Sequence, residues 1–451
     1  MLKNFRIETL FLFLALCVGV VLALGFPPFQ VEDEGPHFYR TYALSEGVVF
    51  PQTDASKPGY LGAVLPKSLY DIVYYPAFSQ VTAAPNQRIA WQDLWGAFSV
   101  PLAPADRASL QYAGVAFYPP FSYAAPAVTV GVGRLFSLPP LSLLYLGRLA
   151  CGALWLLMIY QALRLVPRQA LVLALLALFP LTISQGWALT ADSFSTALSF
   201  LVIAAFLRCA HGPEERLSRK QLILLFSLCA LLTLSKQAYF LLYLLFWLIP
   251  SFKLGGTRRA YLLFALLTLV VFAPLGIWSF LTVSDMGNWV PGVDPKAQMH
   301  FILTHPFEYL WIFLRTLSNE TSAAKLLGRL GWEDAPLPEI LVWFHLILPL
   351  IAAWTAPTEN ENGINWRDRS ILWGVLALSI LLLGTLLFMQ WNTVGHSAIR
   401  GLQRGRYYLP LLPLAFIPLQ GLRPKGASGY VLLAGGGTMM ALYCLAKRYY
   451  L

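Results

Sequence analysis

The sequence predicts an all-α polytopic membrane protein, and three observations point to this fold class. Of the 451 residues, 57% are hydrophobic and 12% are charged, whereas about a quarter of the residues of a soluble protein are charged. The mean hydropathy is +0.61. The apolar residues form blocks of about 20, the length that crosses a bilayer as a helix.

The distribution of charge and cysteine excludes several other classes. Lys and Arg lie between the apolar blocks, so the net charge of +10 indicates membrane orientation and not nucleic-acid binding. The five cysteines lie inside apolar blocks without paired spacing, which is typical of buried hydrophobic residues. No small-residue cleavage site precedes Pro27 and Pro28, so we expect the first apolar block to remain as a helix.

The apolar segments predict about eleven spans. They cover residues 8–26, 141–163, 169–187, 194–208, 221–235, 238–251, 260–282, 338–354, 371–389, 408–420 and 429–445. Lys3 and Arg6 place the start of the first helix in the cytoplasm. The basic connectors RLVPRQ, RCAHGPEERLSRKQ, FKLGGTRR, NWRDRS and LRPKGAS then fall on the same side. The C-terminal AKRYYL lies outside and departs from this bias.

Two long connections, residues 29–140 and 284–336, are expected on the outer side. Together with residues 186–193 and 390–407 they hold much of the charge and aromatic content. Residues 118–136 are apolar but short and interrupted by Pro and Gly, which favours an interfacial helix over a span. We therefore expect one transmembrane domain over the whole chain, with any active site built from these loops at the outer face.

The stretch VEDEGPHFYR concentrates ionisable side chains at the expected membrane edge. Pro36 fits only the first turn of a helix, so we expect a helix to begin near it. Asp33 and Glu34 then precede the helix N-terminus, where the dipole favours an ionised carboxylate. His37 and Arg40 share one face of that helix. A solvated loop would also carry such charges, but ionisable groups at a membrane edge favour a functional site.

The same stretch resembles a family hallmark. EDEGPHFYRTYALSEG is similar to the D-E-P-x-H-F-x-R-A-x-x-x-x-x-G hallmark of a bacterial family of multi-spanning membrane proteins that is grouped with the GT-C glycosyltransferases. The blocks YPPFSY, TADSFSTALSFL, LTLSKQAYFLL, LGRLGWEDAPLP and LQRGRYYLPLLP resemble the family in the same order and span nearly the whole chain. The sequence departs from the pattern at Gly35, where the family usually has Pro, and at Arg404.

The resemblance implies a GT-C-like fold and a glycosyltransferase in the bacterial cytoplasmic membrane. Such enzymes move a sugar from a polyprenyl-phosphate donor to a glycan, lipid or protein acceptor at the outer face. By this resemblance Asp33 is the general base, and Glu34 orients the acceptor or supports a divalent cation such as Mg²⁺ or Mn²⁺. A like-charged neighbour makes a carboxylate more basic. His37 either donates a hydrogen bond to the acceptor or phosphate, forms a metal half-site with Glu34, or only packs the helix.

Cations near the headgroup plane are expected to bind the donor phosphate. Lys236 interrupts a long apolar stretch, so it needs an anionic partner unless it snorkels to the interface. Arg404 and Arg406 offer the bidentate geometry that suits phosphate oxygens. Arg40, beside the acidic pair, is a further candidate.

Acceptor and sugar contacts are expected from other polar positions. Asp192 either binds the acceptor or caps the helix that follows it. Trp332, Glu333 and Asp334 combine an aromatic face with carboxylates, which suits a sugar but also occurs in any wet loop. Tyr407 either contacts the sugar or belongs to an aromatic belt.

Two other classes of function compete with the glycosyltransferase. The sequence has neither a G-x-x-x-x-G-K-[ST] nor a G-x-G-x-x-G motif, which argues against nucleotide sugars and ATP-driven transport. A transporter or flippase of lipid-linked glycans would favour mid-span charges and inverted repeats, but the mid-span positions are almost bare of charge and no repeat is apparent. A non-catalytic subunit of a cell-envelope assembly is the third possibility, and it would leave the acidic stretch without a purpose.

Overall fold

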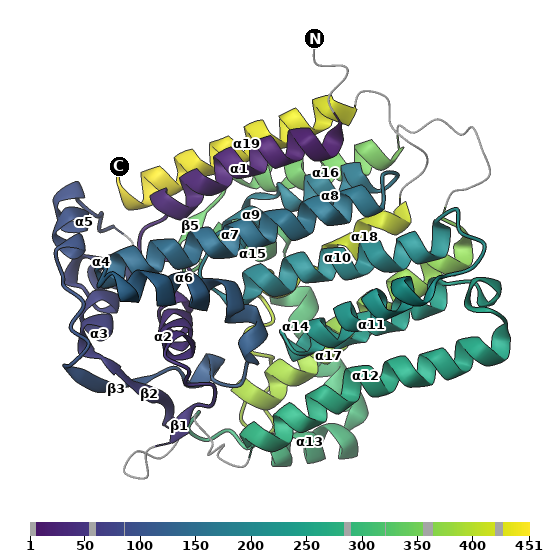
Figure 1. Cartoon of the computed structure of the whole chain (residues 1–451), viewed down its shortest axis with the longest axis horizontal. Coiled ribbons are helices and arrows are strands. Elements are labelled where there is room, and N and C mark those ends of the chain that lie inside the picture. The colour runs from purple at the N-terminus through teal and green to yellow at the C-terminus, as the bar shows by residue number, and fades with distance from the viewer. Residues whose placement is uncertain are drawn as a thin grey trace.

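Long apolar helices make up most of the structure. The computed structural model describes residues 6–53, 60–84, 86–283, 290–320, 322–354, 364–419 and 427–451 (Figure 1). Within these residues, six helices are long and apolar enough to cross a membrane. They are α1 (Ile7–Gly25), α7 (Pro140–Leu165), α10 (Ala191–His211), α12 (Thr257–Val283), α17 (Trp366–Trp391) and α19 (Ala427–Tyr449). The prediction of a helical membrane protein is confirmed at this level.

The other five predicted spans coincide with shorter or broken helices. They are α8 (Ala170–Ala177) with α9 (Pro180–Gly186), α11 (Arg219–Thr233), the 3₁₀ helix η4 (Gln237–Leu248), α16 (Glu339–Trp354), and the series η7 (Leu409–Leu411), α18 (Leu412–Phe416) and η8 (Ile417–Leu419). Pro180 separates α8 from α9, because proline has no N–H for the helical hydrogen bond. The count of eleven spans therefore stays a prediction.

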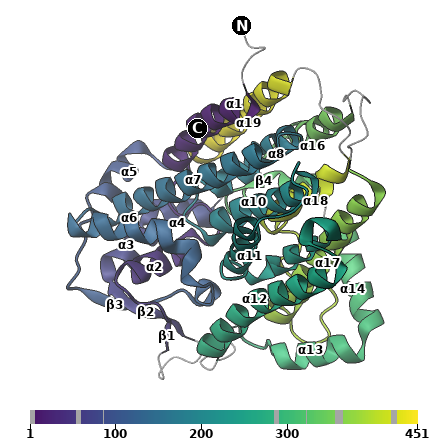
Figure 2. The ribbon, with the colours of Figure 1, turned by 45° about the vertical axis from the view of Figure 1, so that its right-hand side comes forward.

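The centre of the bundle is built on close helix contacts. Figure 1 shows α1 and α19 side by side along one edge, and α7, α10, α11 and α12 follow in order across the bundle, an order that Figure 2 repeats from another side. The indole of Trp187, which follows α9, packs against Gly19 of α1 and Gly152 of α7. A Cβ at either glycine would overlap the indole, so small residues set the approach of these helices.

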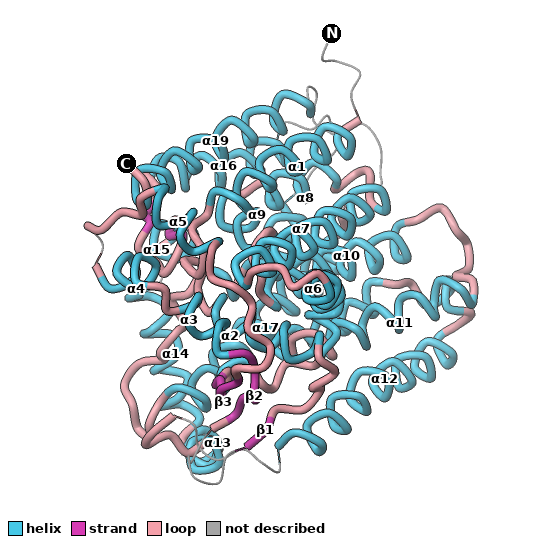
Figure 3. Tube along the Cα trace, turned by 60° about the vertical axis from the view of Figure 1, so that its left-hand side comes forward, coloured by secondary structure: helices cyan, strands magenta, loops and turns pink. Residues whose placement is uncertain are grey.

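The first long connection, residues 29–140, folds into a small mixed unit at one end of the bundle (Figure 3). Its helices are α2 (Glu34–Ser45), α3 (Lys67–Val73), α4 (Pro76–Ala83), α5 (Trp91–Phe98), η2 (Ala113–Val115), η3 (Pro120–Tyr123) and α6 (Ala124–Leu135). An antiparallel sheet of β1 (Gln52–Thr53), β2 (Leu61–Pro66) and β3 (Arg107–Gln111) pairs Ala63 with Leu110. The sequence did not predict this sheet. Residues 118–136 form η3 and the short α6 and are not among the candidate spans, as expected.

The second long connection, residues 284–336, is helical where it is described and ends in a hairpin. It contains α13 (Pro295–Thr304), α14 (Pro306–Glu320), α15 (Ala323–Leu327) and the strand pair β4 (Arg329–Leu330) and β5 (Ala335–Pro336). The hairpin turn needs positive φ at Gly331 and Glu333. Several parts of the sequence predictions lie outside the described residues: Lys3, the start of this connection at 284–289, most of LRPKGAS, residues 54–59 and 85 of the first connection, Thr321 and Gln420.

Candidate functional site

Charged side chains from four distant segments meet at one place. This charged cluster consists of Glu32, Asp33, Asp192, Lys236, Arg404 and Arg406. The two acids at 32 and 33 precede α2, Asp192 lies in the first turn of α10, Lys236 precedes η4, and the arginines flank the start of η6 (Gly405–Tyr407). Three carboxylates and three cations balance formally, which reduces the cost of burying them together.

Arg406 is the centre of the cluster. Its side chain is 4% exposed, and its Nη2 donates to Asp33 Oδ2 at 2.5 Å. The same guanidinium lies 3.2 Å from Glu32 Oε2 and 3.8 Å from Asp192 Oδ2. Arg404 adds a second cation, with its Nη1 2.6 Å from Glu32 Oε1. One guanidinium therefore links all three carboxylates.

Lys236 and Asp192 form a buried ion pair beside Arg406. The Lys236 ammonium also lies over the ring of Tyr407, 4.9 Å from its centroid, and near the rings of Tyr118 and Tyr239. The anionic partner that the sequence required for Lys236 is thus a side chain of the same protein. The ammonium sits in an aromatic enclosure, where cation–π attraction adds to the ion pair.

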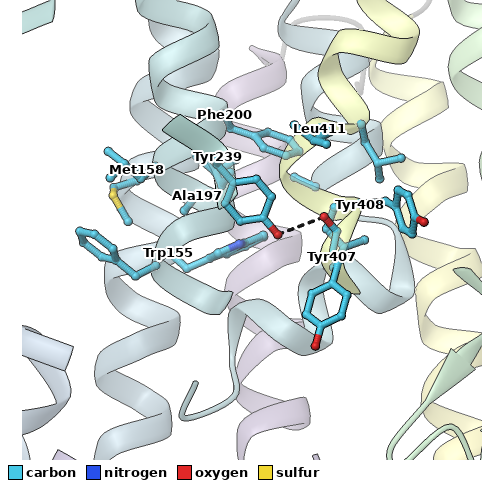
Figure 4. Packing of buried hydrophobic residues seen from close by; sticks show 14 of the residues in the cluster. Trp155, Met158, Ala197, Phe200, Tyr239, Tyr407, Tyr408 and Leu411 are labelled. Carbon is cyan, nitrogen blue, oxygen red and sulfur yellow. Dashed lines mark hydrogen bonds between the residues drawn. The ribbon is translucent and has the colours of Figure 1, made fainter. Parts of the chain in front are cut away.

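The arginine loop is held in place by two close contacts. The Tyr239 hydroxyl donates to the Tyr407 carbonyl at 3.0 Å (Figure 4). Gly405 approaches α15 so closely that a Cβ would overlap the Leu326 carbonyl. Only glycine fits there, and the close approach fixes where Arg404 and Arg406 emerge.

Helix α2 positions Asp33 and His37. It begins at Glu34, so Pro36 lies in its first turn as expected, and Asp33 precedes it in the left-handed conformation with φ 63°. The His37 Nδ1 lies 2.8 Å from the Tyr123 hydroxyl. Burial lowers the pKa of His37 to about 4, although the charges of Asp192 and Asp33 oppose the shift. The imidazole that faces the charged cluster is therefore neutral at pH 7.

The two neighbouring acids of the cluster differ in their titration. Burial raises the pKa of Glu32 above its usual value, against the charges of Arg406 and Arg404. Burial acts in the same direction on Asp33, but the charge and hydrogen bond of Arg406 outweigh it, and the pKa of Asp33 is lowered. The Asp33 side chain is 36% exposed, compared with 7% for Glu32 and 5% for Asp192. Asp33 is thus the accessible, ionised carboxylate of the cluster.

Glu34 and Arg40 do not join this cluster, so the expected convergence of the acidic pair, His37 and Arg40 is wrong in part. The Glu34 carboxylate is fully buried and accepts hydrogen bonds from Arg148 Nε at 2.7 Å and Nη2 at 2.6 Å. Backbone N–H groups of Phe29 and Leu189 also donate to it. Arg40 donates to the Val49 carbonyl at 2.8 Å and lies over the ring of Tyr112. A buried charged group needs a nearby polar partner. Glu34 finds its partner in Arg148 and Arg40 finds its partner in the Val49 carbonyl, so neither side chain lies with Asp33.

The predicted site residues of the second long connection differ in how they relate to the charged cluster. Asp334 pairs with Arg448 and accepts a hydrogen bond of 2.8 Å from the Tyr449 hydroxyl, so it anchors the hairpin to α19. The Trp332 Nε1 donates to the Phe29 carbonyl at 3.0 Å. Glu333 comes close enough to the cluster to contribute to the raised pKa of Glu32. A narrow pocket here is lined by Glu32, Gln185, Lys325, Arg329, Glu333 and Arg406.

Sequence reasoning missed several residues of this arrangement. Glu32 belongs to the same acidic run as Asp33, and Tyr118 and Tyr123 belong to the YPPFSY block, so a signal for them was present. Tyr239 follows Lys236 by three residues. Arg148 lies inside the predicted span 141–163, and a charge within an apolar span signals a buried partner, but nothing in the local sequence identifies that partner as Glu34.

A divalent cation does not fit the arrangement. In the described part of the chain, no group of three or more His, Cys, Asp or Glu side chains is placed to hold a metal ion. The half-site of Glu34 and His37 does not form, because Arg148 and Tyr123 take their polar atoms. The three carboxylates of the cluster all have cationic partners.

The apolar helices and the charged cluster define a polytopic membrane protein with a buried ionisable site at the ends of its helices. The chain belongs to the predicted membrane protein family DUF2142, whose model matches residues 16–415. This match includes every residue of the charged cluster. Comparison with curated proteins gave no match, and comparison with solved structures gave none.

Proposed function

We propose that this protein is a membrane-embedded glycosyltransferase of the GT-C type. It moves a sugar from a polyprenyl-phosphate donor to an acceptor on the outer face of the bacterial cytoplasmic membrane. The observation that carries the proposal is the charged cluster, in which an accessible carboxylate adjoins three cations at the ends of apolar helices. A lipid phosphate has an anionic head and an apolar tail, so its head matches the cations of the cluster and its tail matches the apolar helices.

Asp33 is the general base in this proposal. The acceptor hydroxyl gives its proton to the Asp33 carboxylate while its oxygen bonds to the anomeric carbon of the sugar. The bond between that carbon and the phosphate oxygen breaks, and polyprenyl phosphate leaves with the bonding electrons. Asp33 suits this role because it is the most exposed carboxylate of the cluster and is ionised at neutral pH.

Arg406 couples the base to the leaving group. While it is bonded to Asp33, the lowered pKa makes that carboxylate a weak base. A donor phosphate that draws the guanidinium toward itself weakens this pair and raises the basicity of Asp33. The base thus becomes effective only when the donor is in place. Lys236 and Arg404 supply further positive charge where the leaving phosphate develops negative charge.

The remaining predicted site residues divide between binding and support. Glu333 lines the narrow pocket together with Glu32, and Trp332 precedes it in the hairpin turn and is bonded to the Phe29 carbonyl. These two residues are our candidates for contacts with the sugar or acceptor. His37 is neutral and hydrogen-bonded to Tyr123, so it is a hydrogen-bonding group and not a cation for the phosphate. Glu34, which is enclosed with Arg148, supports the start of α2 and has no role in orienting the acceptor.

The test is donor turnover in liposomes. Purified protein is reconstituted and given a panel of labelled polyprenyl-phosphate sugars with candidate acceptors, and release of polyprenyl phosphate is measured. Asp33→Asn is compared with wild type and with Asp71→Asn, a control that removes an exposed carboxylate of α3. Turnover that is lost in Asp33→Asn and kept in Asp71→Asn supports the proposal and identifies the sugar.

Other outcomes contradict part or all of the proposal. Equal turnover in wild type and Asp33→Asn would remove the base from Asp33. Transbilayer movement of a labelled lipid-linked glycan without any turnover would favour the transporter or flippase. Absence of both activities in folded protein, with every donor and acceptor class supplied, would favour a non-catalytic envelope subunit.

A further inference from the structure

A second polar cavity lies at the opposite ends of the same helices. Its volume is about 900 Å³, within the range of small-molecule sites. The last turns of α7 and α10, the connection to α8, the 3₁₀ helix η5 (Ser251–Leu254) and the start of α17 surround it. Helix α10 runs from Asp192 in the charged cluster to His211 in this cavity, which is about 30 Å at the helical rise. The cavity is therefore separate from the charged cluster.

The lining of this basic cavity is strongly cationic. Its charged and titratable lining residues are Arg164, Arg168, Arg208, His211 and Lys253. Two nearby carboxylates are already engaged. Glu214 accepts two hydrogen bonds of 2.6 Å from Arg208, and Asp368 lies 3.3 Å from His211.

Two cations of the cavity have no carboxylate partner within the described chain. Lys253 is 6% exposed, and its Nζ donates to the Gly212 carbonyl at 2.7 Å. An ammonium has three donors, and no other hydrogen bond from the Lys253 ammonium is seen among the described residues. Arg164 lies over the ring of Tyr160 and makes no ion pair in the same part of the structure. Glu214 attracts Lys253 at longer range, but neither cation makes a direct ion pair with a carboxylate among the described residues. Burying a charge without such a contact is costly, so the cavity that both cations line favours an anion.

The start of α8 adds to the positive electrostatic potential of the basic cavity. Gln169 lines the cavity and precedes α8. The Gln169 side chain does not cap the helix. The first N–H groups of α8 therefore receive no hydrogen-bond acceptor from the N-cap side chain. A helix N-terminus favours negative charge, and here it adjoins a cavity that is already cationic.

We propose that the basic cavity binds a phosphate group, with Arg164 and Lys253 as its principal ligands. The shared chemistry is a phosphate anion, which is carried either by the headgroup of an anionic phospholipid or by a free phosphate compound. The cavity lies on the side of the bilayer that the basic connectors predict to be cytoplasmic, where basic pockets between helices suit anionic headgroups. This inference does not depend on the glycosyltransferase proposal.

The experiment measures binding to full-length protein in neutral detergent. The lipid probe is a short-chain phosphatidylglycerol, which has a net negative charge. The control is the phosphatidylcholine of the same chain length, whose choline cation balances the phosphate, and bound lipid is counted by native mass spectrometry. The soluble probe is inorganic phosphate, titrated by calorimetry. The variants are Arg164→Gln and Arg164→Gln with Lys253→Gln. Lys220→Gln is the matched control, because Lys220 is exposed at the start of α11 and does not line the cavity.

Each outcome decides the inference. We expect the double variant to lower the affinity for one probe by at least about tenfold, because two charge-assisted contacts are lost, while Lys220→Gln leaves it unchanged. Loss with phosphatidylglycerol alone identifies a lipid headgroup, and loss with inorganic phosphate identifies a free phosphate. Arg164→Gln, which changes an exposed side chain, shows a smaller decrease even where the double variant fails to fold. Unchanged binding of both probes in Arg164→Gln would overturn the proposal.

Discussion

The Arg406 guanidinium donates a hydrogen bond of 2.5 Å to the Asp33 carboxylate, although the two residues are 373 positions apart in the sequence. This contact joins the start of α2 to η6, which is followed by η7, α18, η8 and α19. The same guanidinium also faces Glu32 and Asp192. The charged cluster is therefore at once a long-range connection in the fold and the candidate site.

Loss of Arg406 should destabilise the protein strongly. Arg406→Gln leaves three carboxylates short of their common cation, and breaking a buried ion pair in this way costs about 3–5 kcal/mol. Unfolding in detergent, followed by heating or by denaturant, measures the effect. Arg404→Gln is the control, because that side chain is about one-third exposed and, among the described residues, its ion pair is with Glu32 alone. A loss no larger in Arg406→Gln than in Arg404→Gln would contradict the central role of Arg406.

Gly405→Ala should disturb the same site without removing a charge. The added Cβ would overlap the Leu326 carbonyl, so the arginine loop must move away from α15 and Arg406 must retreat from Asp33. We expect a stability loss of about 1–3 kcal/mol, typical of overpacking. Gly436→Ala is the control, since a Cβ there has no neighbour within 4 Å. Equal stability of the two variants would show that the loop accommodates the methyl group.

The sequence predicted the apolar framework well because helix length and apolarity are local properties. The expected first span at 8–26 corresponds to α1 at Ile7–Gly25, and 371–389 lies inside α17. It did not predict the sheet, whose strands are two to six residues long. Such strands are stabilised by pairing between Leu61–Pro66 and Arg107–Gln111, a distant partnership with little local signal.

The sequence predicted the individual residues of the site more readily than the contacts between them. The charges at 33, 192, 236, 404 and 406 were identified, because each is an ionisable group at the end of an apolar segment. Their partners were not, since periodicity shows where a helix ends but not which other helix ends beside it. Glu34 illustrates the limit. It adjoins Asp33 in sequence, yet the left-handed backbone at Asp33 starts the helix and Glu34 turns to Arg148.

Stability should fall as the pH decreases from about 6.5 to 4, in part through His37. In the unfolded chain the imidazole takes a proton near pH 6.5, whereas burial lowers its pKa in the folded protein to about 4. The unfolded state therefore binds more protons in this window. The difference of about 2.5 pKa units corresponds to about 3 kcal/mol by pH 4.

The variant His37→Asn isolates this contribution. Asparagine keeps a polar group near the Tyr123 hydroxyl but does not titrate. Unfolding of wild type and variant is measured at intervals from pH 7 to pH 4, and the difference between the two curves removes the other titrating groups. We expect the variant to lose less stability than wild type over this range. Parallel curves would mean that His37 takes its proton equally well in both states.

The pair of Glu34 and Arg148 should be structural and separable from turnover. Glu34→Gln leaves a fully buried guanidinium without its counterion and should cost about 3–5 kcal/mol. The double variant Glu34→Gln with Arg148→Met removes both charges and should recover most of that stability. Because neither residue touches the charged cluster, the double variant should also keep donor turnover. Lost turnover in a stable double variant would return Glu34 to the site.

The pair of Lys236 and Asp192 is also buried, but we expect its removal to lower turnover even where stability is restored. Lys236→Met alone leaves Asp192 uncompensated on that side and should cost about 3–5 kcal/mol. The double variant Lys236→Met with Asp192→Asn removes both charges and should again approach wild-type stability. Its turnover should nevertheless stay at least about a hundredfold below wild type, because the leaving phosphate loses a preorganised cation. Measuring unfolding and polyprenyl-phosphate release on the same preparations separates the two effects. Wild-type turnover in the stable double variant would mean that Lys236 only holds α10 to η4, and the cation for the phosphate would then have to be Arg404 or Arg406.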